Sequence, residues 1–154
     1  MDTADPANSW HEIKGPDQIE QLMNRFGRFH DGCIREIHVA TGHSVGEDLS
    51  MDCDWRTTVH LLVQRQRPDP SAMELRFEEV IELHVSPPPP DYVSIIFAAT
   101  FFSQDGIFYW SEDVRWSLES TQRDESTWIA ARRVWWREAS QWMGERLRYK
   151  SDQA

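Results

Sequence analysis

The chain has 154 residues and a formal net charge of −10, and its 40% apolar residues include eight Trp and seven Phe. This length and apolar content fit one domain with a substantial core, while the acidic charge argues against binding to nucleic-acid phosphates. No apolar run approaches the roughly 20 residues of a membrane helix, so we expect no membrane contact. No secretory signal is visible, and neither Cys lies in a C-x-x-C pair. We therefore expect a reduced, cytoplasmic protein.

The charge is unevenly distributed along the sequence. Residues 123–150 carry seven basic and four acidic residues, whereas residues 1–122 carry nine basic and twenty-one acidic residues. An acidic excess keeps a Trp-rich protein in solution. The same asymmetry can also orient an oligomer or attract a basic partner.

The first predicted element is a helix over residues 15–27, preceded by an arm over residues 1–14. Pro16 suits the first helical position, and Gly27 is placed to end the helix in the left-handed region. Apolar residues recur at helical spacing and predict one buried face, made of Ile19, Leu22, Met23 and Phe26.

Strands are predicted in the middle of the chain, over residues 33–40, 57–66 and 73–85. Residues 41–56 are polar and predict a long loop or an irregular sheet edge. In 73–85 the alternation is disturbed at Glu79 and Val80, which indicates a β-bulge. The run Pro87–Pro90 predicts a stiff, extended connector.

A hairpin is predicted from residues 92–104 and 107–112, because Asp105-Gly106 between two apolar runs is a preferred two-residue turn. This turn places Phe101 opposite Trp110 and Ser103 opposite Phe108. The same pattern puts one set of apolar side chains on the core face, namely Ile95, Phe97, Ala99, Phe101, Phe108 and Trp110.

The C-terminal third fits two interpretations. Residues 126–138 have strand composition, which favours a final strand followed by a short helix over 139–148, but the aromatic spacing also fits one long helix. The overall prediction is a single α+β domain. Its N-terminal helix packs on a curved antiparallel sheet of about five or six strands, residues 33–138 are mainly antiparallel β, and a short C-terminal helix follows.

The histidines are the first candidates for chemistry. His30 and Asp31 are adjacent, and His60 and His84 lie on neighbouring predicted strands, so a metal or acid–base site is conceivable if they converge. Metal-dependent HD phosphohydrolases need further ligands spread along several helices. The structural interpretation is therefore favoured, with Asp31 ordering the turn into Gly32.

Other residue groups give weaker indications. The acidic residues of 47–54 lack EF-hand spacing, and Glu74, Glu78, Glu82 and Glu112 are typical of a solvated strand face. No phosphate-binding loop, nucleophile motif or cofactor signature is present, so we expect no cofactor, and both Cys are predicted to be small core residues. Most of the Trp residues are expected in the core or in a dimer interface. Exposed aromatics beside basic residues in 128–148 are the one place where partner binding competes with core packing, and the candidate interface there is formed by Trp135, Trp136 and Trp142.

Two short motifs carry a resemblance. One is Phe29-His30-Asp31, at the start of the first strand, and the other is the later run Leu75-Arg76-Phe77-Glu78-Glu79-Val80. They resemble the F-H-D and L-x-F-x-x-V motifs of small uncharacterised bacterial proteins. Some of those proteins are classed with polymorphic-toxin immunity proteins. The likeness covers roughly residues 16–138. It implies an α+β fold with a curved antiparallel sheet and brings no catalytic residues.

We therefore expect a non-enzymatic protein-interaction domain, immunity-like in character, that binds another protein. The alternative is a small-ligand or metal-binding β protein, conceivably a hydrolase that uses His30 and Asp31. A third expectation is a homodimer joined through the Trp-rich C-terminus.

Overall fold

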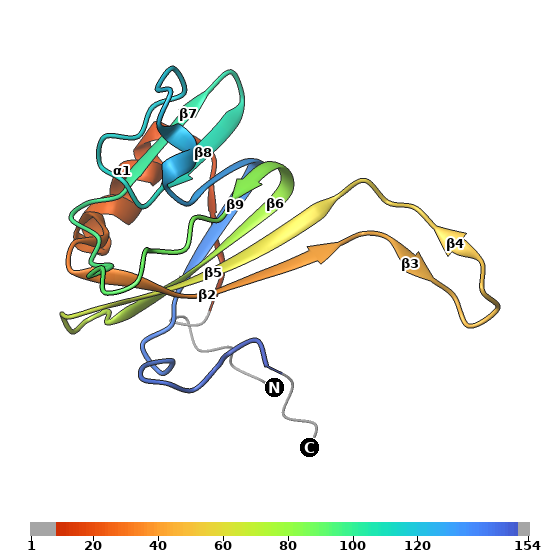
Figure 1. The fold of residues 1–154 in the computed structure, drawn as a ribbon, viewed down its shortest axis with the longest axis horizontal. Coiled ribbons are helices and arrows are strands. Elements are labelled where there is room, and N and C mark those ends of the chain that lie inside the picture. Colours follow the sequence, from red (N-terminus) through yellow and green to blue (C-terminus); the bar gives the residue numbers. More distant parts are fainter. Residues whose placement is uncertain (1–8, 151–154) are drawn as a thin grey trace.

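The computed structural model describes residues 9–150, which form one α-helix and one large antiparallel sheet (Figure 1). The sheet has seven strands in the order β2-β5-β6-β9-β8-β7, and β1 pairs with the second half of β9, beside β8. The strands are β1 (His11–Ile13), β2 (Gly32–Thr41), β5 (Thr57–Arg65), β6 (Ala72–His84), β7 (Thr100–Gln104), β8 (Ile107–Ser111) and β9 (Trp128–Glu138). The α+β class is therefore confirmed.

The helix α1 (Pro16–Arg25) forms where the sequence predicts it, with proline in its first turn. Gly27 follows at φ +56° and opens the short 3-10 helix η2 (Gly27–Phe29). The predicted apolar face is buried against the sheet, and Phe26 contacts Phe29 edge to face. Within the described residues, no helix has both the length and the apolar sequence that crossing a membrane requires.

Two bulges interrupt the regular alternation of the sheet. The register of β6 against β9 shifts between Val80 and Glu82, next to Glu79 at φ +51°, which confirms the predicted disturbance. A second shift, between Ile34 and Glu36 in β2, was not predicted. Because a bulge inserts one extra residue, Ile34 and Ile37 both pack on the core instead of lying on opposite faces.

The Asp105-Gly106 hairpin is confirmed with the predicted register, in which Phe101 pairs with Trp110 and Ser103 with Phe108. Both turn residues have positive φ, as this turn requires. The predicted strand over residues 92–104 is wrong in its first half, because β7 begins only at Thr100. Ile95 and Phe97 are 54% and 72% exposed and do not join the core face.

The predicted final strand of the C-terminal third is confirmed as β9, whereas the short helix predicted after it and the alternative of one long helix are wrong. β9 is bonded to β6 on one side and to β8 and β1 on the other, so it is a central strand. Residues 139–148 form turns rather than the predicted short helix. Their side chains instead contact the sheet face opposite α1, where Ala139 and Trp142 pack with Leu62.

That second sheet face is not simply solvated. Glu74 is fully buried and forms ion pairs with Arg137 (2.8 Å) and with Arg148 (2.7 Å) of the C-terminal segment.

The prediction that both cysteines are core residues is wrong, since Cys33 and Cys53 are free and exposed.

Residues 42–56, which belong to the segment predicted as a long loop or an irregular sheet edge, form a projecting hairpin. Beyond the ends of β2 and β5 the chain makes a separate two-stranded sheet, β3 (Ser44–Val45) and β4 (Met51–Asp52), which extends away from the body (Figure 1).

Candidate functional site

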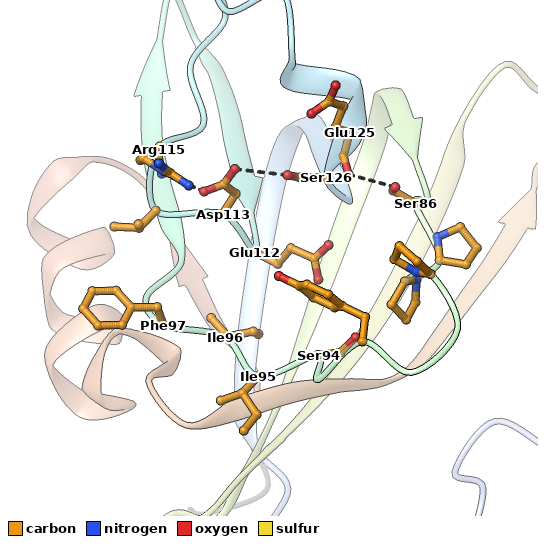
Figure 2. A pocket seen from close by; sticks show the side chains of 15 residues that line it. Ser86, Ser94, Ile95, Ile96, Phe97, Glu112, Asp113, Arg115, Glu125 and Ser126 are labelled. Carbon is orange, nitrogen blue, oxygen red and sulfur yellow. Dashed lines mark hydrogen bonds between the residues drawn. The ribbon is translucent and has the colours of Figure 1, made fainter.

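A cleft of about 580 Å³ lies between two irregular segments, residues 86–97 and residues 112–126 (Figure 2). The first segment contributes prolines and apolar side chains, and the second contributes mainly charged ones. The lining residues include Tyr92, Ile95, Ile96, Phe97, Glu112 and Asp113. This volume lies in the range of natural binding clefts.

The Phe29-His30-Asp31 motif holds the first wall of this cleft. Asp31 N–H donates to the Ile96 carbonyl (3.0 Å), and Ile96 N–H donates to the Gly32 carbonyl (2.7 Å). The His30 Nδ1–H donates to the Phe97 carbonyl at 2.7 Å, since a carbonyl can only accept. The His30 Nε2 lies 3.4 Å from the Asp31 carboxylate. The motif therefore fixes the backbone that presents the exposed Phe97 ring.

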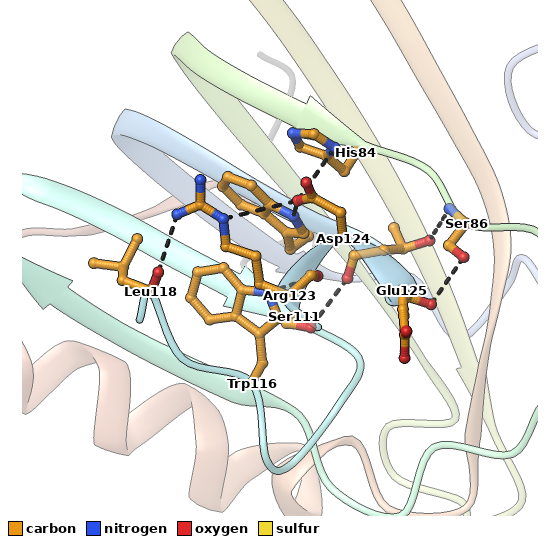
Figure 3. Close-up of polar contacts among 10 residues, drawn as sticks. His84, Ser86, Ser111, Trp116, Leu118, Arg123, Asp124 and Glu125 are labelled. Carbon is orange, nitrogen blue, oxygen red and sulfur yellow. Dashed lines mark hydrogen bonds and ion pairs between the residues drawn. The ribbon is translucent and has the colours of Figure 1, made fainter. Parts of the chain in front are cut away.

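A polar network holds the second wall (Figure 3). The Ser86 hydroxyl donates to the Glu125 carbonyl at 2.8 Å, and the Trp128 indole donates to the Asp124 carboxylate at 3.0 Å. His84 stacks on Trp128 with ring centroids 4.6 Å apart, and its Nδ1 lies 3.5 Å from Asp124. His84 is thus part of the framework that joins β6 to the segment 112–126.

Two carboxylates lie at the base of the second wall. Glu112 is half-buried, and its carboxylate accepts a hydrogen bond from the Thr127 N–H (3.0 Å). Burial raises the pKa of the Glu112 carboxyl, and the hydrogen bond from Thr127 opposes that shift. Asp113 accepts bonds from the Arg115 N–H (2.9 Å) and the Ser126 hydroxyl (3.2 Å). Neither carboxylate has an ion-pair partner within residues 9–150.

The rim of the cleft is unusually apolar for an exposed surface. Tyr92, Val93, Ile95 and Phe97 are 67%, 70%, 54% and 72% exposed within one short segment. Single exposed apolar residues are common on soluble proteins, whereas several within one short segment are less common.

The predicted histidine site is not assembled. His60 pairs with Arg76 of β6, and His84 follows eight residues later on that strand, which separates the two histidines by roughly 25 Å. His60 instead lies on the face opposite α1, beside Tyr149 and His38. No group of three or more metal-ligating side chains occurs in the described part of the chain.

The candidate tryptophan interface is largely covered by the chain itself. Trp135 lies under Arg76 and Arg133, with guanidinium carbons 5.2 and 5.3 Å from its ring. Trp136 stacks on His11 with centroids 4.4 Å apart, and Trp142 packs on the Leu62 cluster. All three are only partly exposed, and the residues that lie open to solvent are elsewhere.

Sequence reasoning missed Tyr92 and Phe97 as surface residues because it assigned them to a strand. The available signal was Pro87–Pro90, since four prolines cannot donate backbone hydrogen bonds to a sheet and favour an irregular, extended path on either side.

Comparisons of the chain with protein-family models, with curated proteins and with solved structures found no match.

Proposed function

We propose that this chain is a non-enzymatic protein-interaction domain whose binding site is the cleft between residues 86–97 and 112–126. The observation that carries the proposal is the row of apolar side chains at the rim, because nothing in the fold requires them to be exposed. The resemblance of the F-H-D and L-x-F-x-x-V motifs to immunity-type proteins points to the same class.

Two carboxylates of the cleft support a partner with a basic side chain. Glu112 and Asp113 lie beside apolar side chains and lack cationic partners among the described residues, so a Lys or Arg side chain flanked by apolar residues matches the cleft. Docking would neutralise Glu112 where solvent is partly excluded, and a charged hydrogen bond there contributes more than one in water. The partner is therefore an extended protein segment with one basic residue between apolar neighbours.

Two further aspects belong to the proposal. The bulges in β2 and β6 increase local strand twist, which supports a curved sheet with the cleft at one end. The free, exposed Cys33 and Cys53 support a reducing, cytoplasmic location.

The test uses the peptide Ser-Leu-Arg-Leu-Ser, acetylated and amidated, titrated into the isotope-labelled full chain and followed by NMR. Amide shifts are expected at residues 94–97 and 112–115, with at least tenfold weaker binding of a peptide that has norleucine in place of Arg. Phe97→Ser should weaken binding, whereas the matched control Val39→Ser, an exposed apolar change on β2, should not. Shifts confined to other surfaces, or equal binding of both peptides, would contradict the proposal.

A second candidate function is binding of a small organic cation. A volume of about 580 Å³ suits a small ligand, and one half-buried carboxyl is enough to select a positive charge. Titration with agmatine separates the two: if it binds as tightly as the Arg peptide, the apolar rim adds nothing and the small-cation function is favoured.

A further inference from the structure

The hairpin formed by residues 42–56, hereafter the β-arm, projects from the seven-stranded sheet (Figure 1). Every residue from 43 to 53 is exposed, and the strands β3 and β4 pair only with each other (Figure 1). Isolated two-stranded hairpins are marginally stable in water. A hairpin that projects in this way would be stabilised by packing against another protein surface.

The β-arm has an ordered tip despite its isolation. Gly46 N–H donates to the Ser50 carbonyl (2.9 Å), and the Asp48 carboxylate accepts bonds from the Ser50 N–H (3.1 Å) and hydroxyl (2.7 Å). At its base, the Arg56 guanidinium forms an ion pair with Asp54. These bonds join the two sides of the tip and connect the Asp48 side chain to Ser50.

Large apolar side chains are exposed on this ordered tip. Leu49 is 84% exposed, Met51 is 65% exposed and Val45 is 56% exposed. Acidic residues lie beside them in the sequence. The β-arm carries four acidic residues, Glu47, Asp48, Asp52 and Asp54, and one Arg, which is paired with Asp54. The hydrogen bonds from Ser50 lower the pKa of Asp48, so this carboxylate stays ionised at neutral pH.

The same chain has a surface with the opposite charge and a similar apolar content, the C-terminal segment of residues 143–150. Met143 and Leu147 are 41% and 40% exposed, and Arg146 and Lys150 are exposed beside them. Within one copy this segment lies under the sheet and well apart from the tip of the β-arm (Figure 1). The two surfaces can meet only between copies.

We propose that two copies of the chain exchange β-arms, so that the arm of each packs on residues 143–150 of the other. A two-fold axis gives two identical arm contacts, as in most closed homodimers. Each contact joins Leu49 and Met51 to Met143 and Leu147, and pairs the acidic arm with basic side chains. This inference is independent of the cleft, because the β-arm lies at the other end of β2 from the Phe29-His30-Asp31 motif.

The first experiment measures the mass of the full chain by light scattering coupled to size exclusion between 1 and 200 µM. The expected result is twice the 18.1 kDa chain mass at the upper end of this range. The double substitution Leu49→Ser and Met51→Ser should weaken dimerisation at least tenfold, and the control Val93→Ser, equally exposed on the cleft rim, should leave it unchanged. A monomer at every concentration, or a dimer indifferent to the arm substitutions, would overturn the proposal.

A charge exchange tests the pairing itself. One variant carries Glu47→Lys and Asp52→Lys in the arm, and the other carries Arg146→Glu and Lys150→Glu in the C-terminal segment. Each variant alone places like charges at both contacts and should be monomeric, with circular dichroism unchanged. An equimolar mixture restores opposite charges at both contacts and should form a heterodimer. Failure of the mixture to associate, when wild type dimerises, would show that the arm and residues 143–150 do not pair.

Discussion

Replacing Glu74 by Gln tests whether the buried carboxylate organises the sheet face opposite α1. Glu74 is 0% exposed and is held by Arg137 and Arg148, whose side chains are 18% and 22% exposed. Loss of one partner from a buried ion pair costs about 3–5 kcal/mol, because it leaves a charge uncompensated. Since both guanidiniums retain some contact with water, we expect the lower figure, about 3 kcal/mol, and a fall in Tm of roughly 6–12 °C.

The assay is urea unfolding followed by Trp fluorescence, with free energies extrapolated to water. The control is Glu78→Gln on the same strand, whose partly exposed pair with Arg76 should contribute only about 0–1 kcal/mol. A double-mutant cycle with Arg148→Met should show that the two losses are not additive, because both remove the same contact. A cost for Glu74→Gln no larger than that for Glu78→Gln would refute the reasoning.

Three further predictions concern pH and backbone conformation. Burial raises the pKa of the Glu112 carboxyl above its ordinary 4.5, so the folded state holds that proton more tightly than the unfolded state. The free energy of unfolding therefore falls as pH rises from 4.5 through the folded pKa. Glu112→Gln removes this titration, so it should raise Tm at pH 7 and make Tm less dependent on pH above about 4.5. Burial lowers the pKa of His60, so the stability contributed by its neutral form is present above 6.5 and lost as pH falls below that value; an NMR titration should place its midpoint below 6.5, and a higher midpoint would contradict its burial. Gly106→Ala should cost about 1–2 kcal/mol in urea unfolding through its φ of +77° alone, since an added Cβ meets no atom within 4 Å; no measurable loss would mean that the turn relaxes.

The site shows how the meaning of a motif depends on its neighbours in space. In the sequence, His30 and Asp31 are candidates for a metal or acid–base site. In the structure, they form hydrogen bonds with the backbone of residues 96–97. The apolar rim and Glu112 could not be assigned to one site from the sequence, because they lie on separate segments that meet only after the sheet has formed. Similarly, His60 and His84 lie on neighbouring strands, but the register separates them along the sheet.

The sequence by itself determined the features that depend on a few neighbouring residues. Helix α1 follows from its apolar spacing between Pro16 and Gly27, and the β7–β8 register follows from the two positive-φ residues of Asp105-Gly106. The disturbed alternation at Glu79 likewise marked the bulge in β6. In each case the local backbone preference and the final fold agree.

Only the tertiary structure decided what long-range contacts control. The irregular path of residues 92–99 is fixed by hydrogen bonds to residues 28–32, and residues 139–148 pack against the second sheet face as turns instead of forming a helix. The bulge between Ile34 and Glu36 moves two isoleucines to the same face through pairing with β5. These outcomes depend on which distant groups satisfy each backbone bond and bury each apolar side chain, and residue spacing along the chain carries no record of those partners.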